Sequence, residues 1–436
     1  MLRLAIPVVF AELGWTAMAT VDTLMVGRLS AEAIGAVSLG SGIFLGVTIF
    51  GMGLLLGLDT LISQAYGAGR LRDCHRWLVH GIYAALILTV PLTGILLVVM
   101  RALPEFGINP AVLELTIPYL KPVMWSLLPL LLYAAARRYL QATGHETAVM
   151  AVLAIANVVN ALTNWGLVFG KWGLPALGVV GAGWATFLSR TFMAIVLLGA
   201  IIWFERKEGH GLFENPFGLE WSRFRELLAL GLPAALHITL EMGLFSVATV
   251  LAGRLDAASL AAHQIALSVA ATTFMVPLGV SSAGAVRVGL AMGAGDRDGV
   301  RHRGWMAIVL GVGFMAVAAL TLFVFPGDII SLFTSDANVL AVGVLLLYVA
   351  GFFQLFDGLQ VVTAGILRGL GDTRTPMVAG LVGYWVLGLP AGYGLCFGLD
   401  WGVSGLWVGM LVGLTTVGVV LLAAWMRRLG LLYGLR

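Results

Sequence analysis

Stretches of about 20 apolar residues recur along the whole chain, and each is long enough to cross the hydrocarbon core of a bilayer as a helix. Hydrophobic residues make up 60% of the 436 positions and charged residues 11%, whereas soluble domains average about 45–50% and 25%. We therefore expect an all-α polytopic membrane protein with twelve transmembrane helices. The expected spans are 4–27, 34–58, 77–100, 118–140, 148–170, 178–203, 228–252, 259–284, 305–326, 340–366, 376–398 and 403–426.

Short motifs of the first half return in the second half. Each is displaced by 226 positions, as from Pro7 to Pro233, and we call this distance the repeat offset. The matched elements are Pro7 with Pro233, Gly-Arg-Leu at 27–29 with 253–255, and Gly-Ala-Gly at 67–69 with 293–295. Each half holds six expected spans, so both copies enter the bilayer from the same side, as two parallel repeats. We expect an N-terminal lobe at 1–204, a cytoplasmic linker at 205–226 and a C-terminal lobe at 227–436.

Basic residues concentrate in the loops on one side of the expected topology, and cytoplasmic loops are the ones enriched in Lys and Arg. The opposite side holds only Arg28, Arg101, Lys121, Lys171 and Arg254. We expect a multi-pass protein of the cell's inner membrane, with both termini in the cytoplasm. The net charge of +3 follows from these loops and gives no reason to expect nucleic-acid binding.

Motifs of several other protein classes are absent from the sequence. It contains no Gly-x-x-x-x-Gly-Lys-Ser/Thr loop for nucleotide phosphates, no His-Glu-x-x-His zinc motif and no Gly-x-Ser-x-Gly nucleophile element. We therefore expect neither an ATP-driven pump nor an enzyme, and no cofactor. A passive cation pathway stays open, because buried acids also line cation pores.

Glycine is abundant, with 57 residues. Between membrane helices small residues let two backbones approach closely. Spacing of four residues at Gly42 and Gly46, and at Gly409 and Gly413, therefore predicts interhelical packing.

Four acidic residues lie inside the expected spans, away from the first turn: Asp22, Asp59, Glu241 and Asp357. A carboxylate at the bilayer centre costs about 2.5–3.5 kcal/mol on insertion scales. By the repeat offset Ala248, Ala285 and Trp15 lie opposite Asp22, Asp59 and Glu241, and by that offset plus one position Leu130 lies opposite Asp357. Because the copied scaffold forms without these acids, we expect a function for Asp22, Glu241 and Asp357. A helix-end hydrogen bond explains Asp59 equally well.

Two further pairs of polar residues each lie on one face of an expected helix. His237 lies one helical turn from Glu241, which fits a proton relay, an ion-coordinating pair or a histidine bonded to a neighbouring helix. Asn160 and Asn164 follow one another at helical spacing on the fifth span. They either make interhelical hydrogen bonds or line a polar cavity.

Two residues of other kinds also stand out. Arg190 in the sixth span is a buried cation, for which Asp22 and Asp59 are the candidate partners. Pro7 lies near the start of the first span, where a missing backbone donor permits either a bend that acts as a hinge or a static kink.

Four segments together resemble the multidrug and toxic compound extrusion (MATE) family, specifically its NorM-like branch. They are Val-Asp-Thr-Leu-Met at 21–25, Ser-Gln-Ala-Tyr-Gly-Ala-Gly at 63–69, Ala-Ala-His-Gln-Ile at 261–265 and the region 357–377. The resemblance covers essentially the whole chain. It implies two six-helix lobes that form a V around a central cavity, and the export of organic cations and amphipathic drugs in exchange for sodium ions or protons by alternating access.

The resemblance also assigns roles to individual residues. Glu241 and Asp357 match acidic positions that the NorM-like branch uses for cation coupling in its second lobe, which implies a Na⁺ or H⁺ site there. Asp22 matches the acid of the first lobe. The branch's use of these positions does not choose between the two coupling ions.

Other matches are weaker in what they imply. Pro7 matches the proline at which the first helix of the family is proposed to bend, and Asn160 and Asn164 resemble asparagines of the first lobe's fifth helix. Asp59 and Arg190 match no core motif of the branch, so their place in a substrate cavity rests on their burial alone.

A lipid-linked oligosaccharide flippase of the same superfamily is the nearest alternative. A cavity for an anionic pyrophosphate lipid should be rich in buried cations, whereas Arg190 is the one buried cation expected here against four acids. We therefore expect small cationic or amphipathic substrates, a protein that contacts only the lipid bilayer besides them, and a monomer.

Overall fold

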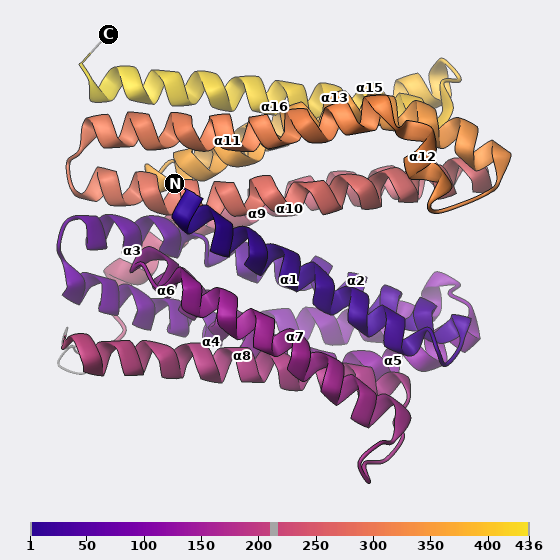
Figure 1. Cartoon of the computed structure of the whole chain (residues 1–436), viewed down its shortest axis with the longest axis horizontal. Coiled ribbons are helices and arrows are strands. Elements are labelled where there is room, and N and C mark those ends of the chain that lie inside the picture. Colours follow the sequence, from indigo (N-terminus) through magenta and orange to yellow (C-terminus); the bar gives the residue numbers. More distant parts are fainter. Residues whose placement is uncertain (1, 210–216, 435–436) are drawn as a thin grey trace. The chain divides into compact units, whose positions relative to one another are not determined.

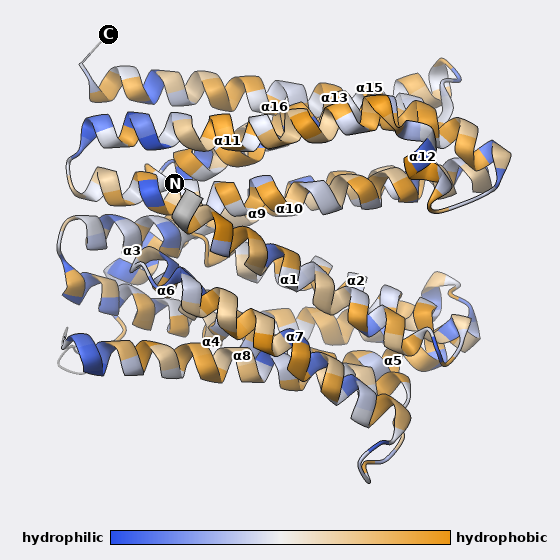
Figure 2. Cartoon of the chain, in the orientation of Figure 1, coloured by the Kyte–Doolittle hydropathy of each residue, from blue (hydrophilic) through white to orange (hydrophobic). Residues whose placement is uncertain are grey.

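Helices make up nearly all of the computed structural model, which describes residues 2–209 and 217–434; these residues contain no strand. Eleven of the described helical segments are long and apolar enough to cross a membrane, and a twelfth candidate is a pair of helices bent by 44°. Hydrophobic residues predominate along the helices, and hydrophilic residues gather towards their ends (Figure 2). The predicted all-α membrane fold is confirmed.

The helices of the first repeat carry its six spans. In chain order they are α1 (Leu2–Val26), α2 (Ala31–Leu54), α3 (Gly57–Gly67), α4 (Leu71–Ala102), η1 (Leu103–Phe106), α5 (Pro110–Trp125), α6 (Leu127–Ala142), α7 (Glu146–Phe169) and α8 (Val179–Glu208). The Ser-Gln-Ala-Tyr motif at 63–66, expected after the second span, lies inside α3.

The second repeat follows the same order. Its elements are α9 (Trp221–Ala252), α10 (Ala257–Gly293), α11 (Arg297–Val324), α12 (Pro326–Ser331), α13 (Ala337–Gly369), α14 (Arg374–Gly380), η3 (Leu381–Gly388), α15 (Leu389–Tyr393), η4 (Gly394–Gly398) and α16 (Gly402–Leu432). The segments η3 and η4 are π-helical.

The residues that bound the second span of each repeat also correspond to one another. Ser30 and Asp256, which are related by the repeat offset, each cap a helix by accepting a hydrogen bond from the backbone N–H three residues later. Gly69 and Gly295 each follow the end of a helix with φ near +70° (72° and 71°), a conformation that glycine adopts at little cost. Residues in or next to the repeated motifs therefore start and end equivalent helices in the two repeats.

The chain divides into two compact units: the N-terminal unit, Phe10–Ala235, and the C-terminal unit, Met1–Val9 with Leu236–Arg436. The two boundaries lie inside α1 and α9 and are themselves related by the repeat offset. Each of these helices thus begins in one unit and ends in the other. The expected lobe boundaries at 204 and 227 stay a prediction.

The two repeats differ in helix continuity. The single helix α13 corresponds to the bent pair α5 and α6, which is interrupted at Ser126. Pro129 explains the break, because a proline removes a backbone donor and its ring clashes with the carbonyl four residues earlier. The position opposite it, at the repeat offset plus one, is Phe356. The predicted continuous span 118–140 is therefore wrong in this respect.

In the C-terminal unit α10, α11, α13 and α16 lie side by side (Figure 1), with glycines at the closest contacts. A Cβ on Gly365 of α13 would lie 2.3 Å from Ser281 Oγ, and one on Gly409 would lie 2.2 Å from Gly392 Cα. These glycines let helices touch, as predicted for Gly409. The same prediction is wrong for Gly42 and Gly46, where a Cβ would meet nothing within 4 Å among the described residues.

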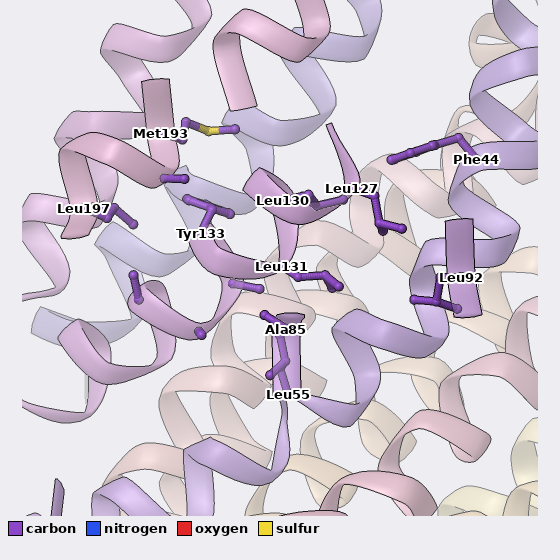
Figure 3. Close-up of a cluster of buried hydrophobic side chains, with 14 of the residues drawn as sticks. Phe44, Leu55, Ala85, Leu92, Leu127, Leu130, Leu131, Tyr133, Met193 and Leu197 are labelled. Carbon is purple, nitrogen blue, oxygen red and sulfur yellow. The ribbon is translucent and has the colours of Figure 1, made fainter. Parts of the chain in front are cut away.

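The N-terminal unit combines an apolar core, which includes Phe44, Leu130 and Tyr133 (Figure 3), with buried ion pairs. Arg138 Nη1 lies 3.4 Å from Asp59 Oδ2, and Arg137 forms an ion pair with Glu12. Arg137 is only 4% exposed, so the expectation of Arg190 as the one buried cation is wrong. Arg137 and the partly buried Arg138 are each paired with an acid, which leaves the charge around them balanced.

Candidate functional site

Two carboxylates of the C-terminal unit share one hydrogen-bond donor. Gln360 of α13 donates from Nε2 to Glu241 Oε1 of α9 at 2.7 Å and, at 3.5 Å, to Asp357 Oδ1 one turn earlier on its own helix. Glu241, Asp357 and Gln360 are 8%, 4% and 0% exposed. The structure therefore brings the two predicted acids to one buried position, with a single amide nitrogen between them.

Other polar groups of the C-terminal unit surround this pair. Tyr384, in the π-helical segment η3, interacts electrostatically with both acids, and its ring lies 6.4 Å from that of His237. Within the described residues, His237 Nε2, Tyr384 Oη and Gln360 Oε1 are buried without a hydrogen-bond partner. No hydrogen bond joins His237 to Glu241 there, so the suggested direct pairing is not observed.

Asp22 occupies a different environment in the N-terminal unit. Its Oδ1 accepts hydrogen bonds from Asn160 Nδ2 at 3.0 Å and Asn164 Nδ2 at 2.7 Å, and its Oδ2 accepts one from Thr186 Oγ1 at 3.1 Å. All four side chains are buried. The asparagines thus hold the acid of α1 against α7, and the threonine holds it against α8.

Arg190 of α8 lies near Asp22 but makes no ion pair with it. Its Nη1 donates to Ser126 Oγ at 2.7 Å, and its guanidinium carbon lies 4.5 Å from the ring centre of Phe44 and 5.7 Å from that of Trp15. Asp59, the other candidate partner, is paired with Arg138 instead.

The sequence reasoning missed Gln360, Thr186 and Tyr384. The signal was present for Gln360, a polar residue three positions after Asp357 and hence on the same helix face. Thr186 and Tyr384 gave no signal, because isolated hydroxyls are common in membrane helices. With two carboxylates and an amide oxygen, the C-terminal set offers the hard oxygen ligands that small cations prefer.

A second charged contact lies in the loop between α13 and α14. Asp372 Oδ2 accepts from Arg428 Nη2 at 2.6 Å and Nε at 3.0 Å, and Thr375 donates to both carboxylate oxygens. Burial tends to raise the pKa of Asp372, but these hydrogen bonds outweigh it and hold the pKa below its ordinary value. The equivalent loop of the first repeat holds His145, 3.1 Å from Glu208.

Comparisons with known proteins identify the family of the chain and agree with its fold. The family model described as MatE matches twice, at residues 7–165 and 233–394, and the starts of the two matches are related by the repeat offset. A probable multidrug resistance protein NorM of Mesorhizobium japonicum is 39% identical over 98% of this chain and 93% of its own length. One of Brucella suis is 35% identical over 98% and 92%.

The same fold occurs in the crystal structure of the eukaryotic MATE transporter AtDTX14, with a TM-score of 0.88 over 98% of this chain and 94% of that one, at 22% sequence identity. The family-model matches cover well over half of the chain, and the relatives cover nearly all of it. The chain therefore belongs to the MATE family, whose members are multi-pass membrane transporters and not enzymes.

Proposed function

We propose that the protein is a secondary active antiporter that exports cationic and amphipathic drugs in exchange for Na⁺ or H⁺ by alternating access. The names of its curated relatives support a role in multidrug resistance. The observation that carries the proposal is the pair Glu241 and Asp357, two buried carboxylates with one shared donor, Gln360.

Two carboxylates so placed repel one another, and removing a charge from water without a partner costs several kcal/mol. A proton on one of them, or a sodium ion held between their oxygens and Gln360 Oε1, relieves this repulsion. A cationic drug relieves it as well. Drug and ion therefore compete for the same negative charge, and binding of one drives release of the other.

Asp22 is a second coupling candidate of a different kind. Three neutral donors already satisfy its charge, so the ion-free state costs less there than at the acid pair. Its binding of a coupling ion should accordingly be weaker. Pro7, inside α1, is the proposed bend that couples such an event to movement of the helix.

Placement in the cell belongs to the same proposal. We infer an inner-membrane protein that works as a monomer. We place both termini in the cytoplasm, because basic residues are concentrated in the loops on one side. Labelling of single cysteines placed at Lys171 and at Arg297 with an impermeant reagent in intact cells should modify the first position and spare the second.

Reconstituted vesicles test the function directly. Purified protein is placed in liposomes, a sodium or a proton gradient is imposed separately, and transport of ethidium, an aromatic cation, is followed by fluorescence. Glu241→Gln and Asp357→Asn should each lower gradient-driven transport at least about tenfold. Glu105→Gln, which neutralises an exposed acid, serves as the control and should leave the rate unchanged.

Three results would contradict the proposal. Wild-type rates in both acid variants would show that the acid pair is not the coupling site. Ethidium movement only down its own gradient would indicate a passive cation pathway. Movement of a pyrophosphate-linked lipid without any cation transport would favour the flippase.

A further inference from the structure

A cavity of about 260 Å³ lies within the C-terminal unit, at the ends of three of its long helices. The last residues of α10 and α16 form its walls, and the loop between α13 and α14 closes it. Its apolar lining comes from Met292, Leu370, Leu431 and Leu432. The ion pair of Asp372 with Arg428 forms its polar side.

The loop that closes the cavity has a counterpart in the N-terminal unit, between α6 and α7. Gly371 and Asp372 correspond to Gly144 and His145 by the repeat offset plus one position. Both glycines adopt the left-handed conformation, with φ of 89° and 86°, which supports this correspondence. The chain therefore turns in the same way at this corner of each unit.

The walls of the cavity correspond as well. Met292, at the end of α10, corresponds by the repeat offset to Tyr66, at the end of α3. Arg428 of α16 corresponds to Glu205 of α8 when these two helices are aligned on their first residues. Tyr66, His145 and Glu205 line one cavity of the N-terminal unit, so the two cavities occupy equivalent places in the repeats.

The N-terminal cavity is nearly filled by its own side chains. It measures about 10 Å³, the space of roughly one water molecule. The ring of His145 lies 4.0 Å from that of Phe204, and its Nε2 lies 3.1 Å from Glu208 Oε1. Since the repeated framework closes this corner in one unit, the larger space in the other unit does not follow from the framework itself.

Positive charge predominates beside the C-terminal cavity. Arg374 follows the closing loop and Arg427 precedes Arg428; both are exposed, and neither forms an ion pair with a residue that the structure describes. Asp372 is 7% exposed and is satisfied by Arg428 and Thr375. Three cations thus stand against one acid, which favours an anionic ligand.

Arg428 has hydrogen-bonding capacity to spare. A guanidinium carries five N–H groups, and Arg428 donates one from Nε and one from Nη2 to Asp372 Oδ2. No other described residue accepts a hydrogen bond from it, and its side chain is half-exposed. The remaining three N–H groups can therefore reach a ligand, and a guanidinium fork matches the geometry of a phosphate.

The cavity lies where a bilayer places its headgroups. The helices α10, α13 and α16 are long and apolar enough to span a membrane, and all three meet the cavity with an end. Hydrophilic residues gather at this end of α16 (Figure 2). Basic pockets between the ends of membrane helices bind the headgroups of anionic lipids, and the apolar wall offers a place for the adjoining carbons.

We propose that this cavity binds an anionic phospholipid of the surrounding bilayer. The lipid phosphate contacts Arg428, Arg427 lies beside the headgroup, and the first acyl carbons pack against Met292, Leu431 and Leu432. The lipid is a resident ligand and not cargo, so the inference goes beyond the proposed export function and does not depend on it. Bound lipid joins the end of α16 to the loop after α13 and thereby stabilises the C-terminal unit.

Lipid titration of the purified full-length protein tests the site. Dioleoyl phosphatidylglycerol, added to the protein in a neutral detergent, should raise the midpoint of thermal unfolding in a saturable way. Phosphatidylcholine, whose headgroup carries no net charge, should raise it clearly less at the same concentration. Glycerol 3-phosphate, which has the phosphate without the acyl chains, should leave it unchanged, and this arm separates a lipid from a soluble phosphate.

Three variants locate the bound lipid. Arg428→Gln should weaken the apparent affinity for phosphatidylglycerol at least about tenfold, the loss expected for a hydrogen bond to a charged group. Arg427→Gln, at an exposed position that folding does not depend on, should weaken it about two- to fivefold. Met292→Tyr introduces the residue of the N-terminal counterpart and fills the cavity, so the saturable shift should disappear. Arg101→Gln removes an exposed cation of the other unit and serves as the control, with no expected change.

Three results would overturn the assignment. Equal shifts with phosphatidylglycerol and phosphatidylcholine would show that the site does not recognise negative charge. A shift of the same size with glycerol 3-phosphate would mean that a soluble anion binds. Wild-type affinity in the variants that fold would place the lipid elsewhere on the protein. None of these measurements involves transport, so the proposed export function is tested separately.

Discussion

The N-terminal unit joins its helices by buried ion pairs at places where the C-terminal unit uses small residues. Asp59 and Arg138 form such a pair. Their counterparts are Ala285, by the repeat offset, and Gly365, by that offset plus one position. A Cβ on Gly365 would lie 2.5 Å from the backbone oxygen of Ser281, so these helices touch directly. The same arrangement of helices thus forms with either an ion pair or a close-packed contact between them. The two repeats therefore resemble one another in their helix caps and loops more than in the residues between their helices.

The site around Asp22 shows the same contrast. Aligned on the first residues of their helices, its partners Asn160, Asn164 and Thr186 correspond to Gly388, Gly392 and Gly409. A Cβ on Gly409 would lie 2.6 Å from the Gly388 backbone oxygen. Where the N-terminal unit has the polar partners of Asp22, the C-terminal unit therefore has a direct contact between helices. The buried acids of the two units accordingly lie at different positions of the repeat.

The largest effect should come from breaking an ion pair that the C-terminal unit lacks. Glu12→Leu leaves Arg137 buried without its partner, which costs about 3–5 kcal/mol. Thermal unfolding of the purified protein in detergent measures the loss. Combining it with Arg137→Met should recover most of the stability, since an apolar pair replaces the charged one. A double variant as unstable as the single one would show that the pair itself, and not the orphaned charge, holds the unit.

A smaller effect should separate the two acidic sites. Gln360→Leu removes the one donor that the acid pair shares within the described part of the chain, and a hydrogen bond to a charged group contributes about 1.5–3 kcal/mol. We expect gradient-driven efflux to fall roughly 10- to 100-fold. Thr186→Val removes one of three donors to Asp22 and should cost less than about fivefold. Losses of equal size would mean that the two sites respond alike.

Glycine substitutions test the close packing. Gly365→Ala pushes a methyl group into Ser281 and should destabilise the protein by about 1–3 kcal/mol. Gly46→Ala, in open space, should be neutral or stabilising by up to about 1 kcal/mol. Both are read from the same thermal unfolding curves, and a Gly365→Ala protein as stable as wild type would refute the close contact.

The smallest effect concerns the loop contacts, whose polarity is reversed between the units. The pKa of Asp372 is lowered from 3.8, so its ionised form stabilises the folded state above that pH, and the contribution is lost as the pH falls through the lowered pKa. Because Arg428 is half-exposed, the contribution is less than about 1 kcal/mol. Wild type should lose stability more steeply than Asp372→Asn between about pH 5 and pH 3. Parallel curves would show that the bridge contributes nothing.

The sequence predicted the parts of this molecule that depend on local rules. Apolar length predicted the spans, and the repeat offset predicted a copied framework, whose caps at Ser30 and Asp256 became visible only in the structure. Asp22, Glu241 and Asp357 stood out because a charge in an apolar span needs a reason; their roles stay predictions. The break at Ser126 was also predictable from Pro129, although it was not predicted.

Side-chain partners were beyond such rules. Nothing in the sequence separates Arg138, which reaches Asp59, from Arg190, which does not, since both lie far from the acids along the chain. Gln360 bridges two helices only because α9 and α13 meet there. Contacts of this kind depend on tertiary packing, for which a single sequence offers no spacing rule.

The passage of α1 from one unit into the other bears on how the chain is assembled as it is made. The segment Leu2–Val9 belongs to the same unit as the helices that follow Leu236. Val9 packs closely against Gly279 of α10, since a Cβ on that glycine would lie 2.8 Å from Val9 Cα. The N-terminal unit can be completed once residue 235 has entered the bilayer. The first two turns of α1, however, cannot pack against α10 until that helix has been inserted, so this segment finds its place only after the rest of its own helix.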